Sequence, residues 1–217
     1  MTSTTIEKKV KIIVDHFTGS VASRLGGKAK AMIVTSSRLH AVRYKLMLDR
    51  YLQTIGTPFK ALVAFTGTVK DPMDGKDYTE AGMNSFPEKD TADRFESDEN
   101  RILVVANKFQ TGFDQPKLVA MYVDKKLQGV NAVQTLSRLN RTFKDQKKET
   151  FVLDFENSAD DIQEAFQPFY DRISLNREVD PNLLYDLERA LEKYAVYQRK
   201  DVEEFAEKWF KGLRAIQ

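Results

Sequence analysis

Gln134, Arg138 and Arg141 carry one amide and two guanidinium groups, separated by four and then three residues. On an α-helix, which turns about 100° per residue, this spacing places the three side chains within roughly 60° of one another. Guanidinium groups bind phosphate oxygens through pairs of parallel hydrogen bonds. The segment therefore predicts a clamp for a phosphate group, although the same spacing is typical of the solvated face of an amphipathic helix.

A second group of polar residues follows an apolar run at residues 102–106. The loop after this run contains Thr111, Gly112 and Asp114 and ends at Pro116. In open α/β sheets, ligands bind at the carboxyl ends of the strands. Gly112 would let a ligand approach the backbone there, and Asp114 could accept a hydrogen bond from a sugar hydroxyl or support a metal-bound water. An ordinary glycine–aspartate turn is the alternative interpretation.

Hydroxyl groups and a further arginine follow two other apolar runs. Thr35, Ser36 and Arg38 stand between the first of these runs and a helical pattern, and Thr66 directly follows the second. Backbone N–H groups and hydroxyls at a helix N-terminus bind anions, and a DNA phosphate backbone is the anion that we expect here. Simple capping of the helix by a serine would give the same pattern.

Five short apolar runs, rich in β-branched residues, must position these groups. Helical patterns or polar loops separate the runs, which is typical of parallel strands covered on both faces, so the sequence predicts an α/β fold. The expected strands are residues 31–35, 61–65, 102–106, 119–123 and 150–154, and the expected helices are residues 6–17, a helix that ends near residue 53, and residues 130–141. Residues 67–100 are expected to form a long loop with one short helix near residues 87–95.

After residue 154 the pattern becomes helical. Ser158 predicts a helix start, with Asp161 three residues later, and further helix starts are expected at Asp180 and Asp201. We therefore expect two parts, an α/β domain at residues 1–157 and a C-terminal helical connector at residues 158–217.

Composition excludes several classes of protein. Of the 217 residues, 41% are hydrophobic and 30% are charged, which is typical of a folding chain. The absence of cysteine excludes disulfide scaffolds and thiolate metal sites, and two histidines are too few for a zinc site, so no metal ligands are expected. No apolar run approaches the roughly 20 residues of a membrane helix, and the N-terminus lacks the apolar core of a signal peptide. We expect a cytoplasmic protein with no membrane partner.

The net charge of +2 is unevenly distributed. Residues 1–155 carry 25 Lys and Arg against 18 Asp and Glu, a net charge of +7. Residues 156–217 carry 9 against 14, a net charge of −5. A basic front part fits a surface that binds a polyanion, although an uneven solvated surface has the same composition.

The order of these segments resembles the second RecA-like lobe of superfamily 2 helicases and translocases. Residues 33–38 resemble motif IV, residues 107–116 motif V and residues 134–141 motif VI. The amino-acid sequence of three segments, residues 106–116, 119–126 and 131–141, resembles even more closely the motor (R) subunit of type I restriction enzymes. The resemblance covers about residues 28–170, with one departure, because Ser137 stands where many superfamily 2 members carry glycine.

The resemblance implies a RecA-like fold and a role in a two-lobed motor that uses ATP and Mg²⁺. The first lobe of such motors supplies the phosphate-binding loop and the metal-binding acidic motif, and the second supplies arginines. Arg141 would then be the arginine finger and Arg138 its partner, while Gln134, Asp114 and Gly112 would contact the nucleotide. The residues that would contact the backbone of double-stranded DNA are Thr35, Ser36, Arg38, Thr66 and Thr111.

Other features of the family are missing from the sequence. There is no G-x-x-x-x-G-K-[ST] loop, no Asp-Glu-x-His-type motif and no Asp…Glu-x-Lys nuclease constellation. We therefore expect that the chain alone neither hydrolyses ATP nor cuts DNA. The resemblance implies that it is part of a larger ATP-dependent endonuclease and translocase, whose other partners are the first lobe of the same protein and the modification and specificity subunits. The alternatives are a non-catalytic RecA-like interaction module and a lobe of another superfamily 2 helicase.

Overall fold

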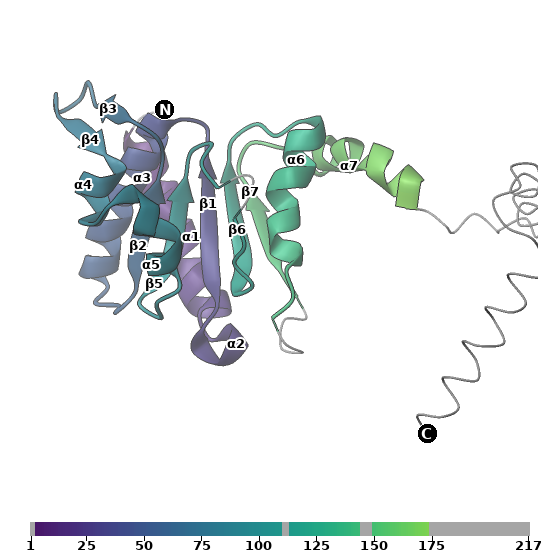
Figure 1. Ribbon diagram of the computed structural model, residues 1–217, viewed down its shortest axis with the longest axis horizontal. Helices are drawn as coiled ribbons and strands as arrows, with labels where there is room; N and C mark the ends of the chain where they lie inside the picture. Colours follow the sequence, from purple (N-terminus) through teal and green to yellow (C-terminus); the bar gives the residue numbers. More distant parts are fainter. Residues whose placement is uncertain (1–2, 110–112, 144–148, 174–217) are drawn as a thin grey trace, which may run out of the picture. The chain divides into compact units, whose positions relative to one another are not determined.

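The computed structural model describes residues 3–109, 113–143 and 149–173 (Figure 1). Two sequence-predicted residues, Thr111 and Gly112, and the helices expected from residue 180 onwards lie outside these ranges. The chain divides into two compact units, residues 1–168 and residues 169–217, and the sheet belongs to the first. The division expected after residue 157 stays a prediction.

A five-stranded parallel sheet organises the first unit. Its order is β2–β5–β1–β6–β7, and every neighbouring pair is parallel. The strands are β1 (Lys30–Thr35), β2 (Lys60–Ala64), β5 (Asn100–Val105), β6 (Leu118–Asp124) and β7 (Phe151–Asp154). All five predicted strands are therefore confirmed, each within two residues at either end, and so is the α/β class.

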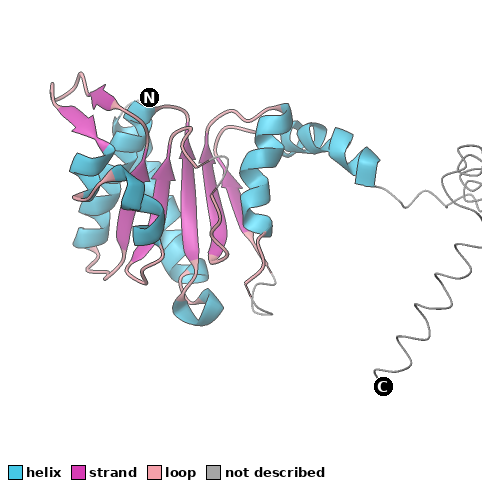
Figure 2. Cartoon of the chain, viewed as in Figure 1, coloured by secondary structure: helices cyan, strands magenta, loops and turns pink. Residues whose placement is uncertain are grey.

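Helices cover both faces of this sheet (Figure 2). On one face lie α1 (Ser3–His16), the π-helical turn η1 (Phe17–Val21) and α3 (Arg38–Thr54), and on the other lie α5 (Thr91–Phe95), α6 (Gly129–Leu136) and the first part of α7 (Ala159–Ile173). A short helix, α2 (Arg24–Gly27), precedes β1. Each face of the sheet has its own apolar core. Because successive residues of a strand point to opposite faces, β1 contributes Ile33 to the core beneath α1 and α3 and Met32 to the core beneath α5 and α6.

The apolar stripe of α1 has the predicted spacing. Its members, which continue into η1, are each at most 1% exposed: Ile6, Val10, Ile13, Val14 and Phe17. The start of α3 also follows the prediction, because Ser37 Oγ accepts a hydrogen bond from the backbone N–H of His40 at 3.2 Å. At the start of α7, Ser158 and Asp161 form the expected reciprocal cap, with backbone-to-side-chain distances of 2.8 and 3.2 Å.

The segment between β2 and β5 is more structured than the sequence predicts. It contains an antiparallel hairpin of β3 (Thr68–Lys70) and β4 (Asp77–Thr79), then α4 (Glu80–Asn84), the 3₁₀ turn η2 (Glu88–Asp90) and α5. The helical stretch near residues 87–95 is confirmed, but the long loop before it is wrong. The hairpin is held from outside by Arg43 of α3, whose guanidinium donates to both carboxylate oxygens of Asp71 at 3.0 and 2.8 Å. This ion pair lowers the pKa of Asp71.

A buried carboxylate joins three elements at the end of β6. Asp124 Oδ1 accepts a hydrogen bond from Lys9 Nζ of α1 at 2.5 Å, and Oδ2 accepts one from the Tyr44 hydroxyl of α3 at 2.7 Å. The Asp124 side chain is 1% exposed, so burial and two donors fix it in place. The same burial raises the pKa of the Tyr44 hydroxyl, which keeps it a donor.

Lys30, at the opposite end of the sheet, predicts a pH dependence of stability. Its ammonium is buried and donates to the carbonyl oxygens of Ser97 and Asn100, both at 2.7 Å. Burial lowers the pKa of Lys30 from 10.5 to about 8, so between these values the unfolded chain binds more protons than the folded one. The free energy of unfolding should therefore rise with pH over this interval, by up to about 3 kcal/mol.

Urea unfolding of the unmodified protein and of Lys30→Met, repeated at several pH values from neutral to about 10, measures this term. The difference in unfolding free energy between the two proteins should increase in favour of the unmodified protein above about pH 8. A difference that stays constant with pH would contradict the assignment.

In the part of the chain that the structure describes, no helix has the length and apolar character needed to cross a bilayer.

Candidate functional site

The loops that follow β1 and β2 emerge at the same edge of the sheet, because the strands are parallel, and β5 lies between the two strands. Arg38, the first residue of α3, donates from Nη1 to the carbonyl oxygen of Thr66 at 2.9 Å. Ser36, Arg38 and Thr66 are all exposed. The structure therefore brings three of the predicted DNA-contacting residues together on one surface.

Gly67 allows the close approach of these two loops. Its φ angle is +74°, a conformation that favours glycine, and a Cβ atom here would lie 3.3 Å from Arg38 Nη1. A side chain at this position would both strain the turn and press on the guanidinium. The glycine therefore preserves the position of Arg38.

Thr35 does not belong to this surface. It is fully buried, and its hydroxyl donates to the carbonyl oxygen of Val105 at 3.0 Å. A side chain without exposed surface does not touch a bound strand of DNA, so the expected contact at Thr35 is corrected. Its hydroxyl instead links the end of β1 to the end of β5.

The loop after β5 begins with an unusual backbone. Asn107 and Phe109 have φ angles of 61° and 62°, which are rare outside glycine. Contacts on both sides hold this conformation. Lys125, after β6, donates from Nζ to Asn107 Oδ1 at 2.8 Å, and the Phe109 ring lies 4.8 Å from that of Phe113. Sequence reasoning missed Lys125, although its place directly after a strand marks the same edge of the sheet.

Further along this connection, Asp114 meets Arg141. Arg141 Nε lies 3.3 Å from Asp114 Oδ1, and the two side chains are 53% and 70% exposed. Such an exposed ion pair contributes about 0–1 kcal/mol, so little free energy holds Arg141 away from another anion. Arg141 of the predicted phosphate clamp and Asp114 of the loop after β5 thus lie together in the structure.

Arg138 is fixed to the same stretch of chain. Its Nη1 donates to the carbonyl oxygen of Phe113 at 2.8 Å, and the side chain is half-buried. The backbone contact of Arg138 and the ion pair of Arg141 therefore reach two consecutive residues. Gln134 lies exposed on α6, one helical turn before Arg138.

The three residues do not form the predicted stripe of a single helix. The α-helix ends at Leu136, residues Ser137–Asn140 form the 3₁₀ turn η3, and Arg141 is extended at φ −71° and ψ 131°. A 3₁₀ turn has about three residues per turn, so the angular argument made for an α-helix fails here. The arginines converge because both bind the segment at Phe113 and Asp114.

The polar groups on these side chains are of the types that bind the phosphates and the nucleoside of a nucleotide. Two guanidinium groups suit phosphate oxygens, and the Asp114 carboxylate and the Gln134 amide suit the hydroxyls and polar edges of a nucleoside. Within the described ranges, no group of three carboxylate or histidine side chains gathers to hold a metal ion.

Comparison with known proteins finds one matching family. Residues 71–157 match the family described as type I restriction enzyme subunit R domain 3. The MjaVIIP type I restriction enzyme endonuclease subunit of Methanocaldococcus jannaschii is 32% identical over 154 residues, which cover 65% of this chain and 14% of that protein. The chain is therefore similar to the R subunits of type I restriction enzymes, and residues 71–157 match one domain of that family.

Two further matches agree with this assignment. The type I restriction enzyme HindI endonuclease subunit of Haemophilus influenzae is 30% identical over 156 residues, again 65% of this chain and 14% of that protein. The chain thus spans about one seventh of the length of these curated relatives. A solved structure of an HsdR subunit of a type I restriction enzyme from Vibrio vulnificus covers 78% of this chain and 30% of its own, with a TM-score of 0.52 and 18% identity. The predicted RecA-like fold is confirmed.

Proposed function

We propose that this chain is part of the R subunit of a type I restriction–modification system and forms the second motor lobe of its ATP-dependent DNA translocase. The observation that carries the proposal is the exposed pair of Arg141 and Asp114, with Arg138 bound beside it to the carbonyl of Phe113. An exposed arginine and a half-buried arginine, both bound to the connection between β5 and β6, suit a lobe that acts on a nucleotide held by a partner lobe.

The arginines would act on the charge that develops in phosphoryl transfer. That reaction depends on positioning and on neutralising negative charge, and an arginine supplied from outside the phosphate-binding loop is worth about 10³–10⁵ in rate. Arg141 would bind an oxygen of the γ-phosphate after it leaves Asp114. Arg138 would orient this segment, while Asp114 and Gln134 would contact the nucleotide. ATP with Mg²⁺ supplies the transferable phosphoryl group and a cation that neutralises its oxygens.

The surface formed by the loops after β1 and β2 would hold one strand of double-stranded DNA. Ser36, Arg38 and Thr66 offer hydroxyls and one guanidinium, which bind phosphates without reading the sequence. Contacts of this kind suit a motor that moves along DNA of any sequence. Thr111 and Gly112 remain proposed members of this surface and of the nucleotide site respectively.

The remaining parts of the activity belong to other groups. In this proposal, the first RecA-like lobe of the same R subunit provides the phosphate-binding loop and the metal ligands. The modification and specificity subunits assemble with the R subunit, and DNA cleavage uses residues outside this chain. The chain alone then hydrolyses no ATP and cuts no DNA.

Salt-dependent DNA binding by the chain tests this proposal. Fluorescence anisotropy with a labelled duplex of arbitrary sequence, measured over a series of salt concentrations, gives the slope of log K against log salt concentration. We expect Arg38→Ala to weaken binding and to reduce the slope by about 0.9, the value for one phosphate contact.

Lys60 provides a matched control, because it is also an exposed cation but begins β2 at the opposite end of the sheet. Lys60→Ala should leave the slope nearly unchanged. If the chain shows no salt-dependent binding, or if both variants behave alike, the DNA-facing surface is wrong and the interaction-module alternative gains support.

A further inference from the structure

Glu80, the first residue of α4, is a buried carboxylate with three hydrogen-bond donors. Its side chain has no exposed surface. Oε1 accepts from the Thr91 hydroxyl at 2.5 Å, and Oε2 accepts from the backbone N–H of Phe65 at 2.8 Å and from Lys108 Nζ at 2.7 Å. A buried charge is costly unless it is paired and hydrogen-bonded, and here the donors come from three separate segments.

These contacts lie beyond the end of the sheet. The ladder between β2 and β5 reaches the pair Ala64 and Val105, and one more backbone hydrogen bond joins Ala106 to Ala64 at 3.1 Å. After that point, Phe65 leads into one loop and Lys108 into the other. Glu80 therefore continues the connection between the two strands where backbone pairing has ended.

Lys108, the partner of Glu80 in the loop after β5, lies between two residues with unusual backbone conformations. Lys108 is flanked by Asn107 and Phe109, which both have positive φ angles. Its side chain is only 20% exposed, and its ammonium also approaches Glu88 at 3.4 Å. An ammonium held by two carboxylates is a poor phosphate contact, and its evident role is to anchor the loop.

We propose that Glu80 is a positioning residue, which fixes the loop after β2 relative to the loop after β5 and so sets the geometry of the DNA-facing edge. This inference rests on the proposed function, because it assumes that these loops bind DNA. It goes further by assigning a role to a residue that itself touches no nucleic acid.

Glu80→Gln tests the inference through the sign of its effect on DNA affinity. The substitution is nearly isosteric and removes one negative charge, which on electrostatic grounds alone would strengthen binding to a polyanion. A positioning role predicts the opposite, about fivefold to tenfold weaker binding, on the scale of one lost charge-assisted hydrogen bond. The slope of affinity against salt should remain unchanged, since no phosphate contact is removed.

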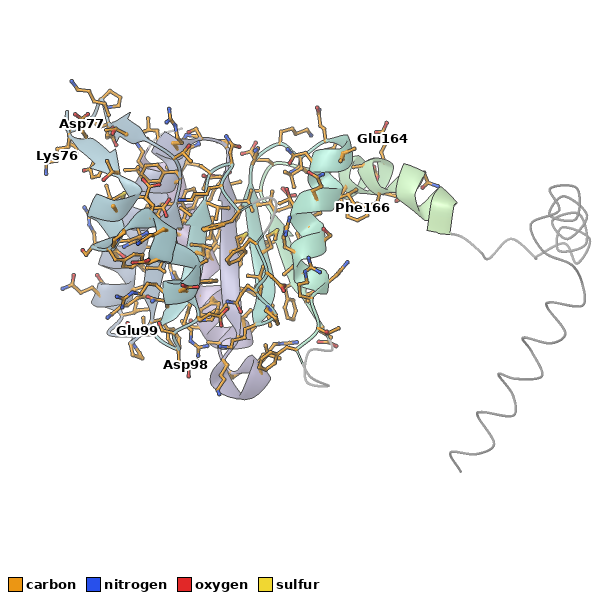
Figure 3. The ribbon with its side chains drawn as sticks, in the orientation of Figure 1. Lys76, Asp77, Asp98, Glu99, Glu164 and Phe166 are labelled. Carbon is orange, nitrogen blue, oxygen red and sulfur yellow. The ribbon has the colours of Figure 1, made fainter. Side chains whose placement is uncertain are left out.

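Glu99→Gln is the matched control. Glu99 is 54% exposed and lies at the end of the sheet opposite to the hairpin residues Lys76 and Asp77, as Figure 3 shows. Its replacement removes the same charge and should leave the affinity equal or slightly higher. Glu80→Asp keeps the charge but shortens the side chain, and it should also weaken binding. Hydrogen exchange at the Phe65 amide should be faster in both Glu80 variants.

Each outcome is decisive. Folded Glu80→Gln protein that binds DNA as Glu99→Gln does would overturn the inference, as would unchanged exchange at Phe65. If Glu80→Gln does not fold, Glu80→Asp carries the test, and failure of both to fold would show a role in overall stability instead of positioning. If the unmodified chain does not bind DNA, the proposed function fails, whereas the exchange measurement still reports whether Glu80 holds the loop.

Discussion

Arg141→Ala should lower the DNA-stimulated ATPase rate of the assembled R subunit by about 10³-fold or more, the range expected for loss of an arginine finger. DNA binding should be largely kept, because Arg141 is paired with Asp114 and is not among the proposed DNA contacts Ser36, Arg38 and Thr66. Steady-state ATPase assays with and without DNA, together with a DNA-binding titration, measure both quantities.

The size of this effect follows from where Arg141 lies. Its side chain is 53% exposed and its only ion pair among the described residues is with an exposed carboxylate, so its removal costs the fold little. The loss should therefore fall on the chemical step. Arg141→Lys keeps the charge but loses the planar pair of donors, and it should recover only a small part of the rate.

Arg50→Ala is a suitable control for the ATPase measurement. Arg50 is an exposed arginine on α3, on the face of the sheet opposite to α6. The control should keep the full rate, so that a general loss of positive charge is separated from the loss of a finger. Retention of ATPase activity in Arg141→Ala would remove the finger assignment.

Asp124→Ala should lower the free energy of unfolding by about 3–5 kcal/mol, the usual cost of leaving a buried charge without its partner. The Lys9 ammonium, on a side chain only 13% exposed, would lose its closest carboxylate, and the buried Tyr44 hydroxyl would lose its acceptor. Chemical denaturation monitored by circular dichroism measures the change.

The matched control for Asp124 is Asp15→Ala. Asp15 pairs with Lys11 at 2.6 Å on the surface of α1, where the two side chains are 52% and 62% exposed. Exposed pairs contribute at most about 1 kcal/mol, so this variant should remain close to the unmodified protein. Equal effects of the two substitutions would mean that Asp124 does not join the helices to the sheet as described.

The strands and α1 were predictable because their signals are local. A buried parallel strand needs a continuous apolar run, and α1 needs an apolar residue at each helical turn, so Ile6 to Phe17 predicts its own buried face. Neither signal depends on what the distant parts of the chain do. The α/β class follows from the alternation of the two signals.

The hairpin and the end of the arginine helix depended on distant contacts. Strands β3 and β4 have three residues each, too few for a period to be recognised, and the hairpin is held by Arg43, 28 residues before Asp71. Likewise, Arg138 lies in a 3₁₀ turn that follows the α-helix, and its side chain reaches Phe113, 25 residues away. Local propensity does not encode such contacts.

The site was partly predictable for a related reason. Chemistry-bearing residue types in the loops after strands mark the edge where ligands bind in α/β sheets, and this rule selected Ser36, Arg38 and Asp114 as candidates. The same rule placed Thr35 there, because a residue at the last position of a strand can point inward or outward and the sequence does not show which. Glu80 was missed, since its link to Lys108 spans 28 residues and joins a segment predicted to be a loop.

Hydrogen bonds and ion pairs hold the connection between β5 and β6 near both of its ends. Glu80 and Lys125 bind it near its start, and Arg138 and Arg141 bind it near its end. A ligand that draws Arg141 from Asp114 changes the forces on a segment whose other end borders the proposed DNA-binding surface. Any coupling between the proposed nucleotide and DNA surfaces through this segment is reciprocal, so each ligand changes the affinity for the other by the same factor. The connection between β5 and β6 would thus couple the binding of ATP to the binding of DNA.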